Sequence, residues 1–451
     1  MRMMTLASAA AALHASMRGA DVDIVRVATD TRTIQPGDLF VALRGERFDG
    51  HRFAQQALDS GAAAVMIAAD SGCSAQPALL VDDTRLALGQ LAAWWRTQMP
   101  ARLVAITGSN GKTTVKEMLA AILRTASSGT AVLATQGNLN NDIGMPLTLL
   151  CLRPEHVYGV IEMGMNHSGE IDYLTRLARP DVALVNNAGA AHVGMLGSVE
   201  NVARAKGEVF AGLGDHGVAV INADDAHAGL WRTLAGRHPA LDFGIDHDAA
   251  IRGSYRASAR GSEVTAATPI GPLQFSLRVA GEHNVRNALA ATAAALALGV
   301  DARAIVNGLA EFRGVAGRLQ FKSALHGATL IDDTYNANPD SVNAALAVLA
   351  TIPGKKILVL GDMGELGEDA AAMHAAIGLA ARAAHVNRLL ALGEMSAAAV
   401  AAFGAGAMHF ERIEELLAEL ENRLDAGVTV LVKGSRFMQM ERVVKSFEVN
   451  R

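Results

Sequence analysis

The chain has 451 residues, of which 51% are hydrophobic and 4% are aromatic, and its formal net charge is −5. This length exceeds one ordinary hydrophobic core, so we expect about two to four domains. The acidic balance offers no basic footprint for nucleic acid, and no apolar run is long enough for membrane insertion. The two cysteines, Cys73 and Cys151, have no metal-type spacing, which fits a reducing cytoplasm.

The N-terminal segment, MRMMTLASAAAALHASMRG, has some features of a signal peptide. However, its apolar core is mostly alanine and is interrupted by His14. The residues Leu6, Ala10, Leu13 and Met17 would share one face of a helix. We therefore expect this segment to be the first helix of a cytoplasmic domain.

Residues 1–98 are predicted to form a small α/β module. Short apolar strands are expected at 39–43, 63–68 and 79–81, with helices between them, which favours a mostly parallel sheet. Arginines near the loop ends would either bind a phosphorylated ligand or remain solvated at the surface. These arginines are Arg32, Arg44 and Arg47.

A phosphate-binding loop is predicted after Pro100, where we place a domain boundary. The apolar strand LVAI at 103–106 ends in TGSNGKTT at 107–114, and a helical pattern follows. In this layout the glycines let the backbone approach the phosphates, the lysine reaches the outer phosphates, and a threonine hydroxyl is offered to Mg²⁺. Ile106 stands where the generic loop has its first glycine, so the loop is a shortened form. An ATP or GTP site is the interpretation that we prefer to a ligand-free glycine turn.

Four further polar features of this central part are candidates for binding. The segment TQGNLNNDIG at 135–144 would bind a polar ligand or form turns. Glu162 ends a predicted strand, where an acid commonly holds Mg²⁺ or else caps the next element. His192 also follows a strand, so it would have a metal, phosphate or structural role. Lys206 lies on the next helix, where an ordinary exposed lysine is the alternative.

A long alanine-rich helix is expected from 281 to 299, and a helix cap is the simplest role for Asn284 near its start. We place the second boundary near Gly314. Beyond it, strands expected at 329–332, 356–360, 388–392 and 428–432 alternate with helices and predict a second doubly wound sheet. Two polar clusters again follow strands, DDTYNANP at 332–339 and KGSR at 433–436.

The motifs TGSNGKTT, EMG, NNAGAAH, AKGE and GEHN occur here in the order in which the Mur ligase family carries them. The whole chain thus resembles this family of ATP-dependent ligases, which build the peptidoglycan stem peptide. Five longer motifs resemble the branch that adds D-alanyl-D-alanine to UDP-N-acetylmuramoyl-tripeptide (UDP-MurNAc-tripeptide). They are GNLNNDIGMPLTLL, EMGMNHSGEI, DDTYNANPDS, LGDMGELG and KGSRFMQME. The Asp-Asn-Pro-Arg motif of the branch that adds the third amino acid is not found, and folylpolyglutamate synthases lack the module TDTR…GDLFVALRGERFDGH.

The resemblance implies an α/β fold of three domains. Residues 1–98 would bind the UDP-sugar, and 99–314 would form a central P-loop ATPase-type parallel sheet that binds ATP. Residues 315–451 would form a Rossmann-like domain that closes on ATP and binds the amine substrate. A cytoplasmic monomer is expected.

The same resemblance implies roles for individual residues. The catalytic residues would be Lys112, Lys206 and His192. ATP would be bound by Gly108, Ser109, Asn110, Gly111, Lys112, Thr113, Thr114, Asn284, Arg318 and Asp333. The other substrates would be bound by Thr31, Arg32, Arg47, Asn138, Asn141, Asn336, Asn338, Lys433, Ser435 and Arg436. One Mg²⁺ would be held by Thr113 and Glu162, and a second by His192 and Lys206 if this lysine is carbamylated.

The implied reaction activates a carboxylate with ATP as an acyl phosphate, which the amine of D-alanyl-D-alanine then attacks. The products would be UDP-MurNAc-pentapeptide, ADP and phosphate, for cell-wall synthesis, cell shape and division. Tripeptides ending in diaminopimelate and in lysine both fit these motifs. The alternatives are another Mur-type ligase that adds a single amino acid, a P-loop kinase, and a nucleotide-gated binding protein without chemistry.

Overall fold

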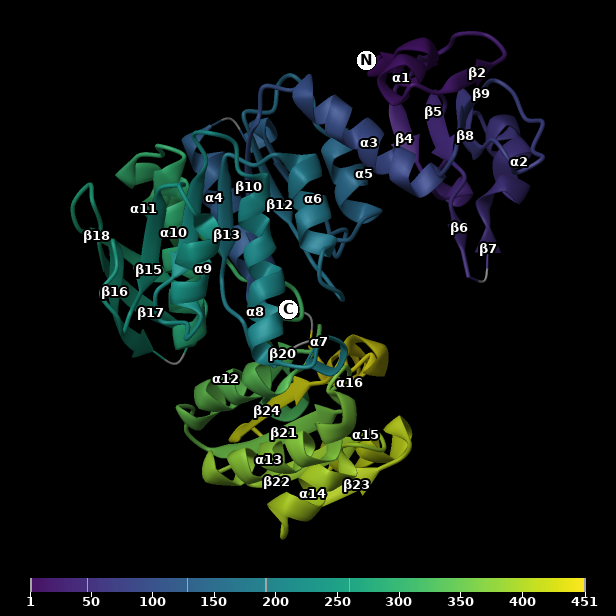
Figure 1. The fold of residues 1–451 in the computed structure, drawn as a ribbon. Helices are drawn as coiled ribbons and strands as arrows, with labels where there is room; N and C mark the ends of the chain where they lie inside the picture. The colour runs from purple at the N-terminus through teal and green to yellow at the C-terminus, as the bar shows by residue number, and fades with distance from the viewer. Residues whose placement is uncertain (1, 47, 128, 191–192, 259, 450–451) are drawn as a thin grey trace.

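A computed structural model describes residues 2–46, 48–127, 129–190, 193–258 and 260–449. Three large sheets with their helices follow one another along the chain, and Figure 1 shows them as an N-terminal, a central and a C-terminal unit. The expected three-domain α/β fold class is therefore confirmed. None of the described helices has the length and apolar character needed to cross a membrane.

The N-terminal unit is built on a five-stranded sheet in the order β2-β9-β8-β5-β4. Its strands are parallel except at β2, which runs antiparallel to β9. The three strands expected from the sequence are present as β5, β8 and β9. The elements are β1 (Met4–Thr5), α1 (Leu6–Leu13), β2 (Ser16–Arg18), β3 (Asp23–Ile24), β4 (Arg26–Ala28), β5 (Asp38–Val41), β6 (Arg44–Gly45), β7 (Phe48–Asp49), α2 (Ala54–Asp59), β8 (Ala64–Ala68), β9 (Ala78–Val81) and α3 (Thr84–Thr97).

The N-terminal segment forms the expected helix α1, which buries Leu6 and Ala10. It is shorter than the sequence pattern predicted. The chain leaves the helix at His14, which has a left-handed φ of 51°, and Met17 lies in strand β2 rather than on the helix. The prediction that Met17 shares the helical face was therefore wrong, because the chain leaves the short alanine-rich helix and forms a strand that pairs with β9.

The central unit contains a nine-stranded sheet in the order β11-β12-β10-β13-β14-β15-β16-β17-β18. Neighbouring strands are parallel as far as β16, and β16, β17 and β18 form an antiparallel extension. The parallel part confirms the predicted architecture. The strands are β10 (Arg102–Thr107), β11 (Val132–Ala134), β12 (Tyr158–Glu162), β13 (Val182–Val185), β14 (Val218–Asn222), β15 (Ala240–Gly244), β16 (Ile251–Ser258), β17 (Gly261–Ala267) and β18 (Leu273–Leu277).

Helices cover both faces of the central sheet. On one face α4, α10 and α11 pack against the buried side chains of the strands, including those of the antiparallel extension. That extension buries alternate residues, as in a sheet with one solvated face. The helices of this unit are α4 (Lys112–Ala126), α5 (Gly144–Leu150), α6 (Glu170–Ala178), α7 (Val193–Leu196), α8 (Val199–Gly207), α9 (Ala228–Ala235), α10 (Glu282–Ala297) and α11 (Ala302–Glu311).

The N-terminal and central units share a continuous hydrophobic core. Helix α3 lies between them in Figure 1 and packs against α5 and α6. The indole N–H of Trp95 on α3 donates a hydrogen bond of 3.0 Å to the carbonyl oxygen of Leu152. The N-terminal unit is thus attached through α3.

The C-terminal unit is a six-stranded sheet in the order β19-β20-β24-β21-β22-β23, parallel except for β19. The four predicted strands are present as β20, β21, β22 and β24, whereas the edge strands β19 and β23 were not predicted. The elements are β19 (Gln320–Ser323), β20 (Thr329–Asp333), α12 (Pro339–Ala350), β21 (Lys355–Gly361), α13 (Ala370–Ala383), β22 (Arg388–Leu392), α14 (Ala397–Phe403), β23 (Ala407–Phe410), α15 (Ile413–Glu421), β24 (Val428–Lys433) and α16 (Glu441–Phe447).

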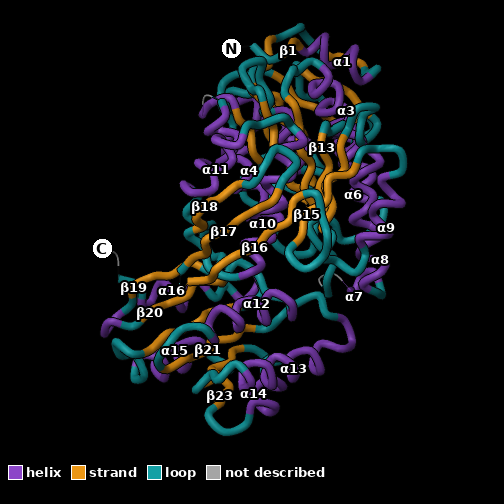
Figure 2. The backbone as a smooth tube through the Cα atoms, turned by 90° about the vertical axis from the view of Figure 1, so that its left-hand side faces the viewer, coloured by secondary structure: helices purple, strands orange, loops and turns teal. Residues whose placement is uncertain are grey.

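The tube in Figure 2 shows the C-terminal unit beneath the central one, with α12 near the junction. The junction contains hydrogen bonds from two C-terminal residues, one from Asn338 to Asn110 in the loop between β10 and α4 and one from Arg318 to Thr113 in the first turn of α4. The polar segments that follow strands in the two units therefore meet at this junction.

Candidate active site

The loop between β10 and α4 has the geometry of a phosphate cradle. Gly111 precedes α4 with a left-handed φ of 81°. A Cβ atom at this position would lie 2.4 Å from the Oδ1 atom of Asn287, so only glycine fits. Within the described part of the chain no side chain caps α4. Its first N–H groups can therefore serve an anion, which the helix dipole also favours.

Thr113 and Glu162 meet beside this loop. The Thr113 hydroxyl donates to Glu162 Oε2 at 2.9 Å, and the Asn140 amide donates to Glu162 Oε1 at 2.8 Å. A hydroxyl and a carboxylate are hard oxygen donors that suit Mg²⁺, which commonly completes its shell with water and substrate phosphates. Among the described residues no cluster of three or more histidine, cysteine and acidic side chains could hold a metal alone. The pair fits an Mg²⁺ ion that arrives with a nucleotide.

Lys112 is the first residue of α4, and its Nζ atom donates to the carbonyl oxygen of Gly108 at 2.6 Å. Desolvation lowers the pKa of Lys112, and the negative charge of Glu162 opposes this shift. The ammonium group thus folds back over the loop, within reach of an anion held there.

Lys206, on α8, is almost completely buried, with 1% of its surface exposed. Desolvation lowers its pKa well below the ordinary value, and repulsion from Lys112 lowers it further. Nζ makes no hydrogen bond or ion pair with any residue that the structure describes. The alternative of an ordinary exposed lysine is therefore wrong, because α8 turns this side chain inward. His192, the proposed companion of Lys206, lies outside the described residues.

A group of asparagines holds the phosphate loop against the neighbouring strand ends. Asn110 donates its backbone N–H to Asn187 Oδ1 at 2.8 Å, and its carbonyl oxygen accepts from the amides of Asn186 and Asn187 at 3.0 Å each. The Asn186 amide also donates to Asn287 Oδ1 at 2.9 Å. Asn284 belongs to the same group and donates to the carbonyl oxygen of Ala280 at 2.7 Å. The N-cap of α10 is Gly281, so the capping role considered for Asn284 is wrong.

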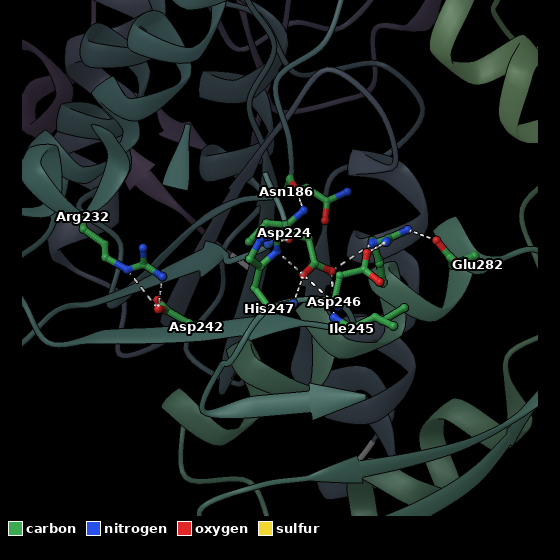
Figure 3. Close-up of polar contacts among 10 residues, drawn as sticks. Asn186, Asp224, Arg232, Asp242, Ile245, Asp246, His247 and Glu282 are labelled. Atoms are coloured by element: carbon green, nitrogen blue, oxygen red, sulfur yellow. Dashed lines mark hydrogen bonds and ion pairs between the residues drawn. The ribbon is translucent and has the colours of Figure 1, made fainter. Parts of the chain in front are cut away.

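The start of α10 is fixed by a second network, which Figure 3 shows centred on Asp224. The Asp224 carboxylate accepts backbone N–H groups of Ile245, Asp246 and His247 at 2.7–3.0 Å and the Nε–H of Arg286 at 3.1 Å. Arg286 also donates to Asp246 at 2.6 Å. Because β14, β15 and α10 are joined in this way, the polar residues at the start of α10 keep a defined position.

His283 lies in that first turn of α10. Burial lowers its pKa to about 4, with the charge of Asp333 opposing the shift, so the imidazole is neutral at neutral pH. A neutral imidazole suits an uncharged ring system better than a phosphate.

Residues of the C-terminal unit contact the phosphate loop directly. Arg318 donates from Nη2 to the Thr113 hydroxyl at 3.1 Å, and its guanidinium lies 4.3 Å from the ring centroid of Tyr335. Asn338 donates its amide to Asn110 Oδ1 at 2.9 Å, and Asp340 accepts the N–H of Ala190 at 3.0 Å. The two units are therefore joined across the site.

The buried Lys433 and the partly exposed Asp333 form an ion pair of 2.6 Å. Asp333 also accepts the N–H of Leu319 at 3.1 Å. Asp333 thereby ties the segment that connects the two units to strands β20 and β24.

These residues enclose a cavity of about 890 Å³ between the central and C-terminal units. Most of the residues that the sequence predicted for nucleotide and substrate binding line it. They are Ser109, Asn110, Gly111, Lys112, Thr113, Thr114, Asn138, Asn141, Glu162, Asn284, Arg318, Asp333, Asn336, Asn338, Lys433, Ser435 and Arg436.

Other predicted residues lie elsewhere. Gly108 belongs to the loop but not to the cavity wall, and Lys206 is buried without lining the cavity. Thr31 and Arg32 belong to the N-terminal unit, where Arg32 pairs with Asp30 at 2.6 Å and stays exposed. Arg47, like His192, lies outside the described residues.

Several lining residues were not singled out from the sequence. They are Asn140, Asn186, Asn187, Asn287, Asp340 and Phe437. Asn140 lies in the amide-rich segment that was predicted to bind a ligand, but the sequence does not tell which amide of that segment turns toward Glu162. The sequence did carry signals for some of the others. Asn186 and Asn187 directly follow a predicted strand, and Asn287 belongs to the motif GEHNVRN.

Three family models match consecutive parts of the chain. They are the Mur ligase family, catalytic domain over residues 23–96, the Mur ligase middle domain over 106–295, and the Mur ligase, glutamate ligase domain over 317–436. Together they extend over most of the chain.

Relatives and solved structures match over nearly the full length. The UDP-N-acetylmuramoyl-tripeptide–D-alanyl-D-alanine ligase of Escherichia coli is 45% identical, over 99% of this chain and 98% of that protein. A crystal structure of MurF from Acinetobacter baumannii is 38% identical, with a TM-score of 0.92 and 98% coverage of both chains. MurF ligase from Thermotoga maritima in complex with ADP is 28% identical, with a TM-score of 0.83 and coverage of 93% of this chain and 96% of that one. The chain therefore belongs to the Mur ligase family.

Proposed function

We propose that this protein is an ATP-dependent ligase that joins D-alanyl-D-alanine to UDP-MurNAc-tripeptide. The observation that carries this proposal is a continuous cavity that extends from the phosphate loop to the strand ends of the C-terminal unit. A ligase must bring a phosphate donor, a carboxylate and an amine together, and such a cavity offers the space. The name of the relative that is 45% identical supports the choice of substrates.

The three units would divide the task. Residues 1–98 bind the UDP-sugar, 99–314 bind ATP, and 315–451 close on the nucleotide and bind the amine. The hydrogen bonds of Arg318 and Asn338 to the phosphate loop support closure of the C-terminal unit over ATP. We also propose a cytoplasmic location, as for an enzyme that uses soluble ATP.

At the phosphate end, the loop N–H groups and Lys112 neutralise the charge of the phosphates. Thr113 and Glu162 hold an Mg²⁺ ion, and a bound Mg²⁺ supplies charge stabilisation for the transferring phosphoryl group. Asn140 keeps Glu162 oriented, because it occupies one carboxylate oxygen while Thr113 occupies the other. At the nucleoside end, His283 and Asn284 lie where they can contact the adenine.

The reaction requires activation of the carboxylate and exclusion of water from the cavity. A carboxylate does not form an amide unaided, because its oxygen is a poor leaving group. Transfer of the terminal phosphoryl group of ATP to the carboxylate gives an acyl phosphate and ADP. The neutral amine of D-alanyl-D-alanine attacks the acyl carbon, phosphate leaves with the carboxyl oxygen, and the amine loses a proton. Water would hydrolyse the acyl phosphate, so contacts that close the cavity protect it.

Lys206 is proposed as the site of a carbamate that would contribute to a second metal position together with His192. The support is its burial and its lowered pKa, because only a neutral amine captures CO₂. The buried amine of Lys206 lacks a partner among the described residues. Conversion to a carbamate would turn it into an anion beside the positive charge of Lys112.

The experiment that tests the function is ATP-dependent phosphate release with each substrate omitted in turn. We expect release only when UDP-MurNAc-tripeptide and D-alanyl-D-alanine are both present, with UDP-MurNAc-pentapeptide detected by mass. Activity with UDP-MurNAc-dipeptide and a single amino acid instead would support another Mur-type ligase. Phosphate retained on a product without consumption of an amine would support a kinase.

A further inference from the structure

Phe437 is an exposed aromatic residue at the wall of the active-site cavity. It is 64% exposed, the highest value among the large apolar side chains that the structure describes. It lines the cavity from the C-terminal side, whereas Met165, Asn166 and Glu170 line it from the central unit. An exposed apolar side chain on an outer surface is common, but one inside a ligand cavity offers a contact to a ligand.

The turn that carries Phe437 is firmly attached, so the ring cannot withdraw into the core. Ser435 accepts the N–H of Gly364 at 2.8 Å and donates its hydroxyl to the carbonyl oxygen of Ala337 at 3.1 Å. On the other side Met440 is fully buried, and a Cβ on Gly434 would lie only 2.6 Å from its Cγ atom. The turn therefore presents Phe437 to the cavity while the neighbouring methionine anchors it.

The ring also has a defined position. A Cβ atom on Gly364 would come within 3.0 Å of Cε1 of Phe437, so the ring lies against the backbone of the loop after β21. The adjacent Arg436 is exposed and is oriented by an ion pair of 2.9 Å with Glu441. An aromatic ring and a guanidinium from adjacent residues of one turn thus both line the cavity, which suits a ligand that carries both an apolar group and a carboxylate.

We propose that Phe437 is a specificity-determining residue for the amine substrate, with its ring in contact with the side-chain methyl groups of a small dipeptide whose carboxylate pairs with Arg436. This inference rests on the proposed function, because D-alanyl-D-alanine carries two methyl groups and one carboxylate. A purely apolar contact of this kind discriminates only modestly, by about 10- to 200-fold for the loss of one small group.

The test compares kcat/KM for D-alanyl-D-alanine and for glycylglycine, which lacks both methyl groups, in wild type and in Phe437→Ala. We expect Phe437→Ala to raise the KM for D-alanyl-D-alanine by about 10- to 100-fold and to reduce the preference over glycylglycine by a similar factor. The KM values for ATP and UDP-MurNAc-tripeptide should stay within about twofold. Phe437→Leu, which keeps an apolar side chain, should restore part of the preference.

Leu379→Ala is the matched control, because Leu379 is 57% exposed on α13 and does not line the cavity. It should leave all the constants unchanged. An unchanged dipeptide preference in a folded Phe437→Ala would overturn the inference, as would an equal loss for all substrates, which would mean that the ring serves closure. If the wild type fails to consume D-alanyl-D-alanine at all, the proposed function itself falls.

Discussion

Lys112, which lines the cavity, and the buried Lys206 lie close enough for their charges to repel each other, and desolvation lowers the pKa of both. The negative charge of Glu162 favours the protonated form of Lys112, and its ammonium group donates a hydrogen bond to the carbonyl oxygen of Gly108. Lys206 has neither a hydrogen bond nor an ion pair within the described residues. Of these two neighbouring lysines, Lys112 is therefore suited to bind an anion, whereas Lys206 is suited to remain uncharged.

Replacing Lys112 or Glu162 by alanine should reduce kcat by at least about 10²- to 10³-fold, because each removes charge stabilisation at the phosphate end. Both variants should remain folded, since neither side chain anchors the hydrophobic core. Steady-state phosphate release measures the effect, and circular dichroism checks the fold. Lys355→Ala, at a lysine whose side chain is 70% exposed, is the control that should retain full activity. Near-normal turnover of folded Lys112→Ala would refute the site assignment.

Replacing Lys206 by methionine should stabilise the protein near pH 7 by about 1–3 kcal/mol, because a buried polar group without a partner usually costs that much. The same replacement should abolish activity. The folded-state pKa is lowered, so between it and the unfolded value the unfolded chain binds one proton more. Wild-type stability should therefore rise with pH in that window, whereas Lys206→Met should lack this contribution. Urea unfolding in CO₂-free buffer at several pH values measures the difference. A Lys206→Met variant that is less stable than wild type at neutral pH would argue against an unpaired neutral lysine.

At the scale of elements, the N-terminus of α12 connects helix stability with domain contact. Asn338 is the N-cap of α12, and its Oδ1 atom accepts the N–H of Ser341 at 2.9 Å. Its amide N–H₂ group donates to Asn110 in the phosphate loop. One side chain thus caps a C-terminal helix and holds the central loop.

Two substitutions separate these roles of Asn338. Aspartate keeps the capping oxygen but cannot donate to Asn110, so Asn338→Asp should retain stability and lose about tenfold in kcat, equivalent to one hydrogen bond of about 1.4 kcal/mol. Asn338→Ala loses both contacts and should also lose about 0.5–2 kcal/mol of stability. Thermal unfolding and turnover are measured for both. Equal activity of Asn338→Asp and wild type would mean that the bond to Asn110 does not matter for the reaction.

Local patterns predicted the elements that carry the phosphate loop, because an apolar strand followed by Gly-Lys-Thr has few alternatives. They failed where pairing between distant segments decides the outcome. Strand β19 forms only because Gln320–Ser323 pairs with β20, and Met17 leaves the predicted helix because β2 pairs with β9. In the site, the residue types after each strand were predicted. Their directions were not, as the inward turn of Lys206 and the bond from Asn140 to Glu162 illustrate.

At the scale of the whole molecule, the three units are attached differently. The N-terminal unit shares a hydrophobic core with the central unit. The C-terminal unit contacts the phosphate loop through polar groups, including Arg318 and Asn338. Polar contacts of this kind are exchanged more readily than a shared core, so we expect the nucleotide to control the position of the C-terminal unit.

A non-hydrolysable ATP analogue with Mg²⁺ should raise the melting temperature, because it binds the folded state alone. At a concentration of 100 times its Kd the stabilisation should be about 2.7 kcal/mol. Thermal unfolding at increasing analogue concentration measures it. The shift should be much smaller in Lys112→Ala and unchanged in Lys355→Ala. An equal shift in Lys112→Ala would place the nucleotide elsewhere.

The proposed ligase function depends on activation of the carboxylate by phosphoryl transfer inside the shared cavity. The most direct measurement uses UDP-MurNAc-tripeptide with ¹⁸O in its reacting carboxyl group, together with ATP and D-alanyl-D-alanine. When the amine attacks the acyl phosphate, the departing phosphate takes one carboxyl oxygen with it, so we expect the released phosphate to carry one ¹⁸O atom for each amide formed. Unlabelled phosphate released alongside the pentapeptide product would contradict it.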